Sequence, residues 1–156
     1  IALGAIHLWR KDGTPVERLR KVADVFVAAM GAVWLIAYEP PAPAIAWLSD
    51  ASNAPERARA SGRPVLIDFG ASWCVACEEL SHKTFTEAAV RREATRFIAI
   101  KVDASEPTPA IDALQSRYQV RGLPTVLIFD SQGREAARVT EFVPAERMLA
   151  LMQRVN

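Results

Sequence analysis

Residues 65–77 have the sequence VLIDFGASWCVAC, and this stretch decides the fold class. Its first part, VLIDF at 65–69, is apolar except for Asp68 and is bounded by proline and glycine, a pattern typical of a strand buried on both faces. Cys74 and Cys77 follow at once, where the pattern predicts the start of a helix. The chain therefore carries a CxxC pair between a buried strand and a helix.

The flanking sequence alternates between strand and helix patterns. Asn53 and Glu56 have the spacing of a helix-capping pair. Helices are predicted over 53–60, 74–83, 87–95, 109–118 and 144–155, and strands over 44–48, 65–69, 97–102, 125–129 and 135–142, with a turn over 130–133. This order predicts an α/β fold in which a central mixed sheet has helices on both faces.

Composition narrows the class of protein. The chain has 156 residues, 51% of them hydrophobic, and a net charge of +1, which excludes an acidic disordered tail and a nucleic-acid binder with a basic stripe. Two cysteines are too few for a disulfide scaffold or a four-cysteine zinc ribbon. A bridge between Cys74 and Cys77 closes a very short loop and adds little stability, so we expect its purpose to be chemical.

The N-terminal part has a different pattern. Residues 1–9 are apolar and are interpreted as the end of a helix, residues 10–21 as a basic polar turn, and residues 22–38 as a transmembrane helix. Since the chain begins at Ile1 rather than a methionine, we expect it to be part of a longer protein. A signal peptide and a buried helix of the soluble domain are the alternatives for residues 22–38.

Charge predicts the orientation of that segment. Five Lys or Arg side chains lie in 10–21, and no further one follows until Arg57. By the positive-inside rule the C-terminal domain faces outward. The proline-rich residues 39–44 (EPPAPA) are a stiff linker, so the predicted domains are 1–38, the end of a membrane domain, and 45–156.

The position of the cysteines predicts dithiol–disulfide exchange. A helix N-terminus lowers the pKa of Cys74 and makes it the attacking thiolate, while Cys77, one turn further along and more buried, resolves the mixed disulfide. A metal site built from Cys74, Cys77 and His82 is the competing hypothesis, but it lacks a fourth ligand. We therefore predict no metal and no cofactor beyond the redox-active disulfide.

Asp68 is the predicted acid of the site. A carboxyl inside an apolar strand is costly to bury, and desolvation raises its pKa so that it can exchange a proton with Cys77 through water. The alternative is that Asp68 points to solvent at the end of the strand.

A second segment is predicted to bind the substrate. Leu123 and Pro124 precede the strand over 125–129, and a cis peptide there would expose the backbone of Leu123 to an incoming chain. A trans proline at a strand start is the alternative. Together with Trp73, beside the dithiol, these residues form the predicted substrate-binding surface.

These motifs resemble the thioredoxin superfamily, and more narrowly the C-terminal periplasmic domain of the DsbD family of bacterial thiol:disulfide interchange proteins. The likeness is carried by WCVAC at 73–77, KTF at 83–85, YQVRGLPT at 118–125, FD at 129–130 and Gly133, and it covers 44–155. The N-terminal part resembles the end of that family's membrane domain. The resemblance implies a thioredoxin-like fold preceded by a transmembrane helix, in the bacterial inner membrane with the C-terminal domain in the periplasm.

The resemblance also implies a protein-disulfide reductase. In that family electrons pass from cytoplasmic thioredoxin through the membrane domain to the C-terminal CxxC, then to an N-terminal domain that reduces disulfide isomerases and cytochrome c maturation proteins. Cys74 and Cys77 would be the relay pair, Asp68 the buried acid and Pro124 the cis-proline. Some relatives carry an acid at the position of Ser81. The alternatives are a tethered thioredoxin-like protein for cytochrome c maturation or disulfide oxidation, a thiol-based metal chaperone, and a non-catalytic binding module.

Overall fold

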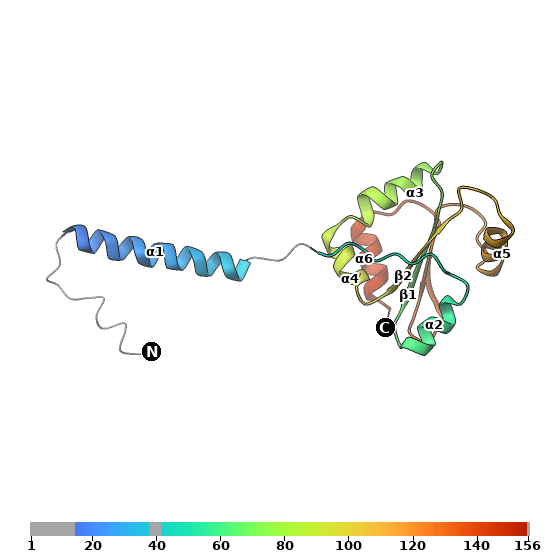
Figure 1. Cartoon of the computed structure of the whole chain (residues 1–156), viewed down its shortest axis with the longest axis horizontal. Coiled ribbons are helices and arrows are strands. Elements are labelled where there is room, and N and C mark those ends of the chain that lie inside the picture. Colours follow the sequence, from blue (N-terminus) through green and yellow to red (C-terminus); the bar gives the residue numbers. More distant parts are fainter. Residues whose placement is uncertain (1–14, 38–41, 156) are drawn as a thin grey trace. The chain divides into compact units, whose positions relative to one another are not determined.

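The computed structural model describes residues 15–37 and 42–155, and the chain divides into two units, Ile1–Pro40 and Pro41–Asn156 (Figure 1). The first unit holds helix α1 (Pro15–Ala37). The second holds all other elements: α2 (Ala54–Ser61), β1 (Val65–Gly70), α3 (Val75–Glu79), the π-helix η2 (Leu80–Thr84), α4 (Ala88–Ala94), β2 (Ile98–Asp103), α5 (Pro109–Arg117), β3 (Thr125–Phe129), β4 (Glu135–Val139) and α6 (Ala145–Gln153).

The second unit is built on a four-stranded mixed sheet in the order β2-β1-β3-β4. β1 pairs in parallel with β2 and antiparallel with β3, and β4 pairs antiparallel with β3. β1 and β3, the two central strands, are buried along their whole length. This is the mixed sheet that the order of elements predicted, and it places the residues that follow β1 at the end of a rigid central strand.

Helices cover both faces of this sheet (Figure 1). On one face, alternate residues of the strands pack with α4, α6 and η2, in a cluster that includes Leu66, Leu80, Val90, Ile128, Met148 and Met152. On the other face they pack with α2 and α5, in a cluster that includes Ala54, Ala58, Ile67, Phe69, Tyr118 and Leu127. Because side chains alternate along a strand, β1 contributes to both cores, as its continuous apolar pattern predicted.

Three local predictions need correction. Residues 44–48 form no strand; Leu48 makes one isolated parallel bridge with Ile100. Asn53 caps α2 by position but makes no side-chain hydrogen bond. The helix predicted over 74–83 changes from α to π geometry at Leu80. At the end of the π-helix, the buried hydroxyl of Thr84 donates a hydrogen bond to the carbonyl oxygen of Val143.

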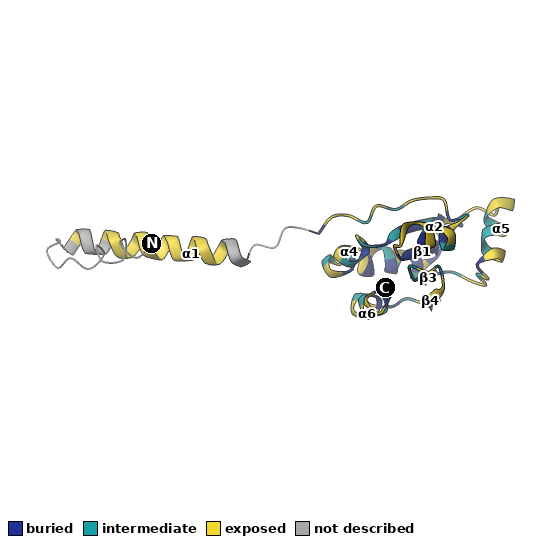
Figure 2. Cartoon of the chain, turned by 90° about the horizontal axis from the view of Figure 1, so that it is seen from below, coloured by how far each residue is buried: buried dark blue, intermediate teal, exposed yellow. Residues whose placement is uncertain are grey.

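The first unit is described by itself. α1 begins at Pro15, so residues 15–21 of the predicted basic turn are helical. Proline is well tolerated in the first turn of a helix. The described side chains of α1 are exposed (Figure 2). Within residues 15–37 and 42–155 no helix has both the length and the apolar character of a membrane span, so the transmembrane helix stays a prediction. The helix end predicted over 1–9 lies outside the described residues.

Candidate active site

Cys74 and Cys77 lie at the start of α3 and are joined by a disulfide bond. Their Cα atoms are 5.2 Å apart, and Cys74 is the residue that caps the helix. The Sγ atom of Cys74 accepts a hydrogen bond from the backbone N–H of Cys77 at 3.3 Å. Because unpaired N–H groups and the helix dipole favour negative charge here, the site is suited to a thiolate on Cys74 after reduction.

The two cysteines differ in what they face. Cys74 is 7% exposed and Cys77 is 6% exposed, so the two are almost equally buried in the disulfide form, and the greater burial of Cys77 stays a prediction. Cys77 lies over Gly70 of β1, where an added Cβ atom would be 3.5 Å from the Cβ atom of Cys77. Cys77 also lines a cavity of about 260 Å³ that Asp68 and Gly70 line from the sheet. Cys77, the predicted resolving cysteine, therefore lines the cavity of the buried acid, and Cys74 does not.

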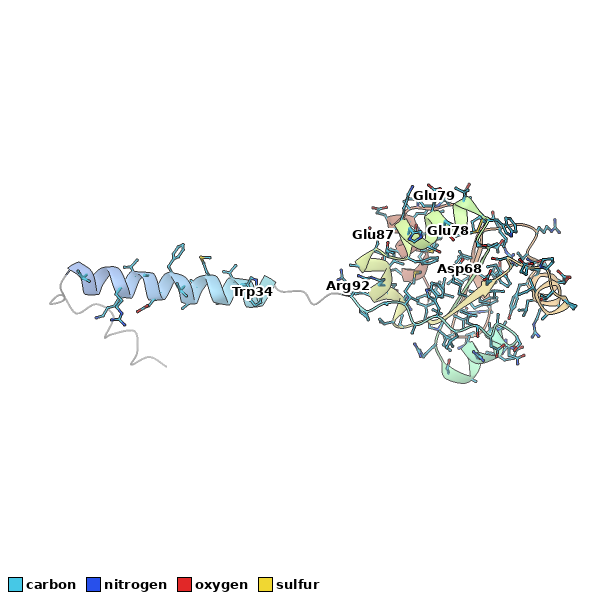
Figure 3. The ribbon with its side chains drawn as sticks, turned by 45° about the horizontal axis from the view of Figure 1, so that its top comes forward. Trp34, Asp68, Glu78, Glu79, Glu87 and Arg92 are labelled. Carbon is cyan, nitrogen blue, oxygen red and sulfur yellow. A yellow bond between two sulfur atoms is a disulfide. The ribbon has the colours of Figure 1, made fainter. Side chains whose placement is uncertain are left out.

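Asp68 is buried in the middle of β1, only 2% exposed, rather than pointing to solvent (Figure 3). Its Oδ1 atom has no hydrogen-bond partner within the described part of the chain. Its Oδ2 atom is 3.8 Å from the Nζ atom of Lys101, an ion-pair distance that is too long for a direct hydrogen bond. Burial raises the pKa of Asp68 to about 6, and the positive charge of Lys101 opposes that rise.

The cavity gives Asp68 a route to Cys77. Ser81 and Lys101 line it beside these two residues, and the rest of the lining includes Ser72, Glu78 and Asp103. A cavity of this size that is lined by several polar groups can hold water, which bridges groups too far apart for direct contact. The arrangement can therefore carry a proton between the carboxyl of Asp68 and the sulfur of Cys77.

Sequence reasoning missed Lys101 as a site residue. Its signal was a single charge inside the apolar pattern FIAIKV at 97–102, but its position opposite Asp68 is set by the register of β1 and β2. The amine of Lys101 also donates a hydrogen bond to the Oγ atom of Ser81 at 3.0 Å. Ser81 stood out in the sequence only as a departure from relatives that carry an acid.

The loop before the dithiol is held by Ser105, which sequence reasoning also missed. The Oγ atom of Ser105 accepts a hydrogen bond from the backbone N–H of Ser72 at 2.8 Å and donates one to Asp103. The indole N–H of Trp73 donates to the carbonyl oxygen of Ser105 at 3.1 Å. The indole of Trp73 is thus held at its N–H edge, while the residue stays 66% exposed beside the disulfide.

The predicted substrate-binding residues lie next to the dithiol. The peptide bond between Leu123 and Pro124 is cis, and Leu123 packs against the cluster of Ala71, Cys74 and Cys77. Two hollows flank this segment, one of about 490 Å³ and one of about 440 Å³, and Leu123 lines both. Trp73 lines the smaller one. The structure therefore places Trp73 and Leu123 along one hollow beside the disulfide, while Pro124, joined to Leu123 by the cis bond, is buried. The role of these three residues in binding stays a prediction.

His82 is not placed to join the cysteines in a metal site. It is exposed, and its Nε2 atom lies 3.2 Å from a carboxylate oxygen of Glu78 on the same helical run. Within the described residues no group of three or more His, Cys, Asp or Glu side chains is arranged to hold a metal ion.

Comparison with known proteins places this site in a family. A family model described as "Thioredoxin-like domain" matches residues 51–156. The chain belongs to the thioredoxin-like domain family. In this family the redox-active CxxC disulfide is the reacting group, which supports thiol–disulfide oxidoreductase activity for Cys74 and Cys77.

The relatives are thiol:disulfide interchange proteins. The chain is 32% identical over 170 residues to the protein DsbD of Ralstonia nicotianae, covering 92% of this chain and 28% of that protein. It is 41% identical over 98 residues to DsbD of Yersinia pestis, covering 62% of this chain and 16% of that protein. The chain therefore spans less than a third of the length of these curated relatives.

Solved structures show the thioredoxin-like fold. The C-terminal domain of DsbD from Neisseria meningitidis in the oxidised form has a TM-score of 0.59 and 24% identity, covering 71% of this chain and 100% of that one. A thioredoxin from Thermus thermophilus has a TM-score of 0.60 and 24% identity, covering 72% of this chain and 87% of that one. The family match, the relatives and the fold together make this thioredoxin-like domain homologous to the C-terminal domain of DsbD.

Proposed function

We propose that this chain is the C-terminal part of a DsbD-like membrane protein and that it acts as a protein-disulfide reductase. The observation that carries the proposal is the Cys74–Cys77 disulfide at a helix start, with Cys77 facing the Asp68 cavity, in a domain homologous to that of DsbD. Residues 1–38 would be the end of the membrane domain, 39–44 the linker and 45–156 the redox domain. The domain would work in the periplasm, tethered to the inner membrane.

Reduction of the disulfide is the first half of the proposed cycle. A thiolate of the donor, a cysteine pair in the membrane domain fed by cytoplasmic thioredoxin, attacks the Sγ atom of Cys74. The bond between Cys74 and Cys77 breaks, and Cys77 leaves as a thiolate that takes a proton from Asp68 through the cavity. The second donor thiol then displaces Cys74, so that the donor becomes a disulfide and two electrons have moved to Cys74 and Cys77.

Delivery of these electrons is the second half. The thiolate of Cys74 attacks a disulfide of the partner and forms a mixed disulfide, which releases one partner thiolate. Cys77 gives its proton to the carboxylate of Asp68 and attacks Cys74, which releases the second partner thiolate and restores the disulfide. We propose that the partners are another periplasmic domain of the same protein and, through it, disulfide isomerases and cytochrome c maturation proteins, which would meet the surface around Trp73, Leu123 and Pro124.

The test is the reduction potential of the Cys74–Cys77 disulfide, measured on the full chain in detergent by equilibration with dithiothreitol buffers. A value between about −270 and −200 mV, the range of thioredoxins and glutaredoxins, is expected of an electron donor fed from the membrane. A value near about −120 mV, typical of a strong disulfide oxidant, would overturn the reductase proposal and favour the oxidation alternative.

A cysteine variant separates this function from the other classes of protein. Cys74→Ser removes the attacking sulfur, so a reductase should lose all disulfide reduction. A non-catalytic binding module would keep its affinity for the partner, and a thiol-based metal chaperone would purify with stoichiometric metal in the wild-type protein.

A further inference from the structure

The amine of Lys101 lies at the edge of the Asp68 cavity, and Ser81 holds it there. The Nζ atom of Lys101 donates a hydrogen bond to the Oγ atom of Ser81 at 3.0 Å and is 3.8 Å from the Oδ2 atom of Asp68. The side chain of Lys101 is 41% exposed, whereas that of Asp68 is 3% exposed. A flexible, half-exposed ammonium group therefore stands beside a buried carboxyl, and a neutral hydroxyl is its hydrogen-bond acceptor.

The helical run from α3 into η2 brings Ser81 to this position. Ser81 follows Cys77 by four residues, which is the spacing of side chains on one face of a helix, and both residues line the cavity. The backbone of Lys101 is fixed by its place in β2 and by the hydrogen bond that its N–H donates to the carbonyl oxygen of Leu48 at 2.8 Å. Only the long side chain of Lys101 is left to be positioned.

Other charges around the cavity compete for this ammonium group. Glu78 lines the cavity from α3, and Asp103 lines it from the end of β2, on the same face of the strand as Lys101. Both acids are exposed, and β3 presents the uncharged Val126 opposite Asp68. Besides Cys77 after reduction, Asp68, Glu78, Asp103 and Lys101 are the titratable groups of the cavity. The centroid of the Trp47 ring also lies 6.0 Å from the ammonium nitrogen of Lys101, but the ring offers no hydrogen-bond acceptor. Without the hydroxyl of Ser81, the ammonium group can therefore turn from the buried carboxyl toward the exposed ones.

We propose that Ser81 is a positioning residue that holds the ammonium group of Lys101 against Asp68 and thereby tunes proton exchange between Asp68 and Cys77. The proposal rests on the role of Asp68 in the proposed function. Loss of the Ser81 hydroxyl releases the ammonium group toward solvent, Glu78 and Asp103. The carboxylate form of Asp68 then loses its neighbouring positive charge, so Asp68 holds its proton to a higher pH.

The test is the pH titration of the Asp68 carboxyl carbon by NMR in the oxidised full chain, where neither cysteine titrates. The matched pair is Ser81→Thr, which keeps the hydroxyl, and Ser81→Val, which has the same shape without it. Ser81→Val and Ser81→Ala should raise the titration midpoint by about one pH unit, while Ser81→Thr should stay near the wild type. Ser116→Ala, an exposed serine on α5, is the control and should leave the midpoint unchanged.

A double-mutant cycle shows whether Ser81 acts through Lys101. Lys101→Met should raise the midpoint at least as far as Ser81→Val does, and adding Ser81→Val to Lys101→Met should change it no further. Equal midpoints for Ser81→Val and Ser81→Thr would overturn the proposal, and so would a full further shift in the Lys101→Met background. The titration needs no partner protein, so it can fail while the reduction potential supports a reductase, and it can succeed while that potential does not.

Discussion

Replacing Asp68 by asparagine should stabilise the folded protein at neutral pH. The side chain is buried, its Oδ1 atom has no partner among the described residues, and burial raises its pKa from 3.8 to about 6. The folded state thus binds the proton of Asp68 more tightly than the unfolded chain does. Stability must therefore fall as the pH rises from about 4 to above 6, because ionisation favours the unfolded chain over this range.

The size of the effect follows from the same two values. At about 1.36 kcal/mol per pH unit, the difference between 3.8 and about 6 corresponds to a cost of about 3 kcal/mol when Asp68 is ionised in the folded state at pH 8. Asparagine has the same shape and no charge. The free energy of unfolding of Asp68→Asn should therefore be about 2 to 3 kcal/mol larger than that of the wild type at pH 8. At pH 4 folded Asp68 is largely protonated, and the gain should fall to about 0.5 kcal/mol.

Denaturant unfolding of the oxidised wild type and of Asp68→Asn at both pH values measures this gain. Asp103→Asn is the matched control. Hydrogen bonds from Ser105 lower the pKa of Asp103, so this carboxylate contributes stability that is lost on acidification, and its removal should cost stability at pH 8. If Asp68→Asn and the wild type were equally stable at pH 8, or if their difference did not depend on pH, the account of Asp68 as a buried, partly unsatisfied carboxyl would be refuted.

Three further predictions follow from the site and the fold. Cys77→Ser should accumulate a mixed disulfide, formed when the Cys74 thiolate attacks a partner disulfide and releases one partner thiolate, because no resolving sulfur is left; mass spectrometry under non-reducing conditions detects it. Ser105→Ala should destabilise the domain by about 1 kcal/mol and speed amide hydrogen exchange at Ser72, whose N–H loses its acceptor. Gly133→Ala should cost at least about 1 to 3 kcal/mol in denaturant unfolding, because Gly133 has a φ of +72° and its added Cβ would lie 2.4 Å from a carbonyl oxygen of α2.

Each of these three predictions has a control variant that tests its physical cause. Cys74→Ser should form no mixed disulfide, and trapping by this variant instead would reverse the assigned roles. Ser116→Ala should leave exchange at Ser72 unchanged. Gly62→Ala also places alanine at a positive φ of +64° but with no atom within 4 Å, so it should cost less than Gly133→Ala. Equal costs at the two glycines would remove the steric part of that argument.

Most of the fold could be predicted because its elements have strong local patterns. The apolar runs at 65–69 and 125–129 match β1 and β3 within one residue, since central strands are buried on both faces. Predictions failed where pairing partners or packing decide the outcome. Residues 44–48 contribute one bridge instead of a strand, and β4 ends at Val139 although the pattern extended to 142. Nothing local in residues 80–84 signals the π geometry of η2.

The sequence by itself predicted the redox pair and a buried carboxyl next to it. CxxC after an apolar strand predicts a dithiol at a helix start, and a carboxyl inside that strand predicts a raised pKa, because both features depend on neighbours within the same short stretch. Only the tertiary structure decided which groups surround them. Lys101 reaches Asp68 through the register of two strands, and Ser81 reaches Lys101 because η2 packs on one face of the sheet. These contacts join residues 20 and 33 positions apart in the chain, where no periodic pattern connects them, so the charge balance of the cavity is a property of the packed fold.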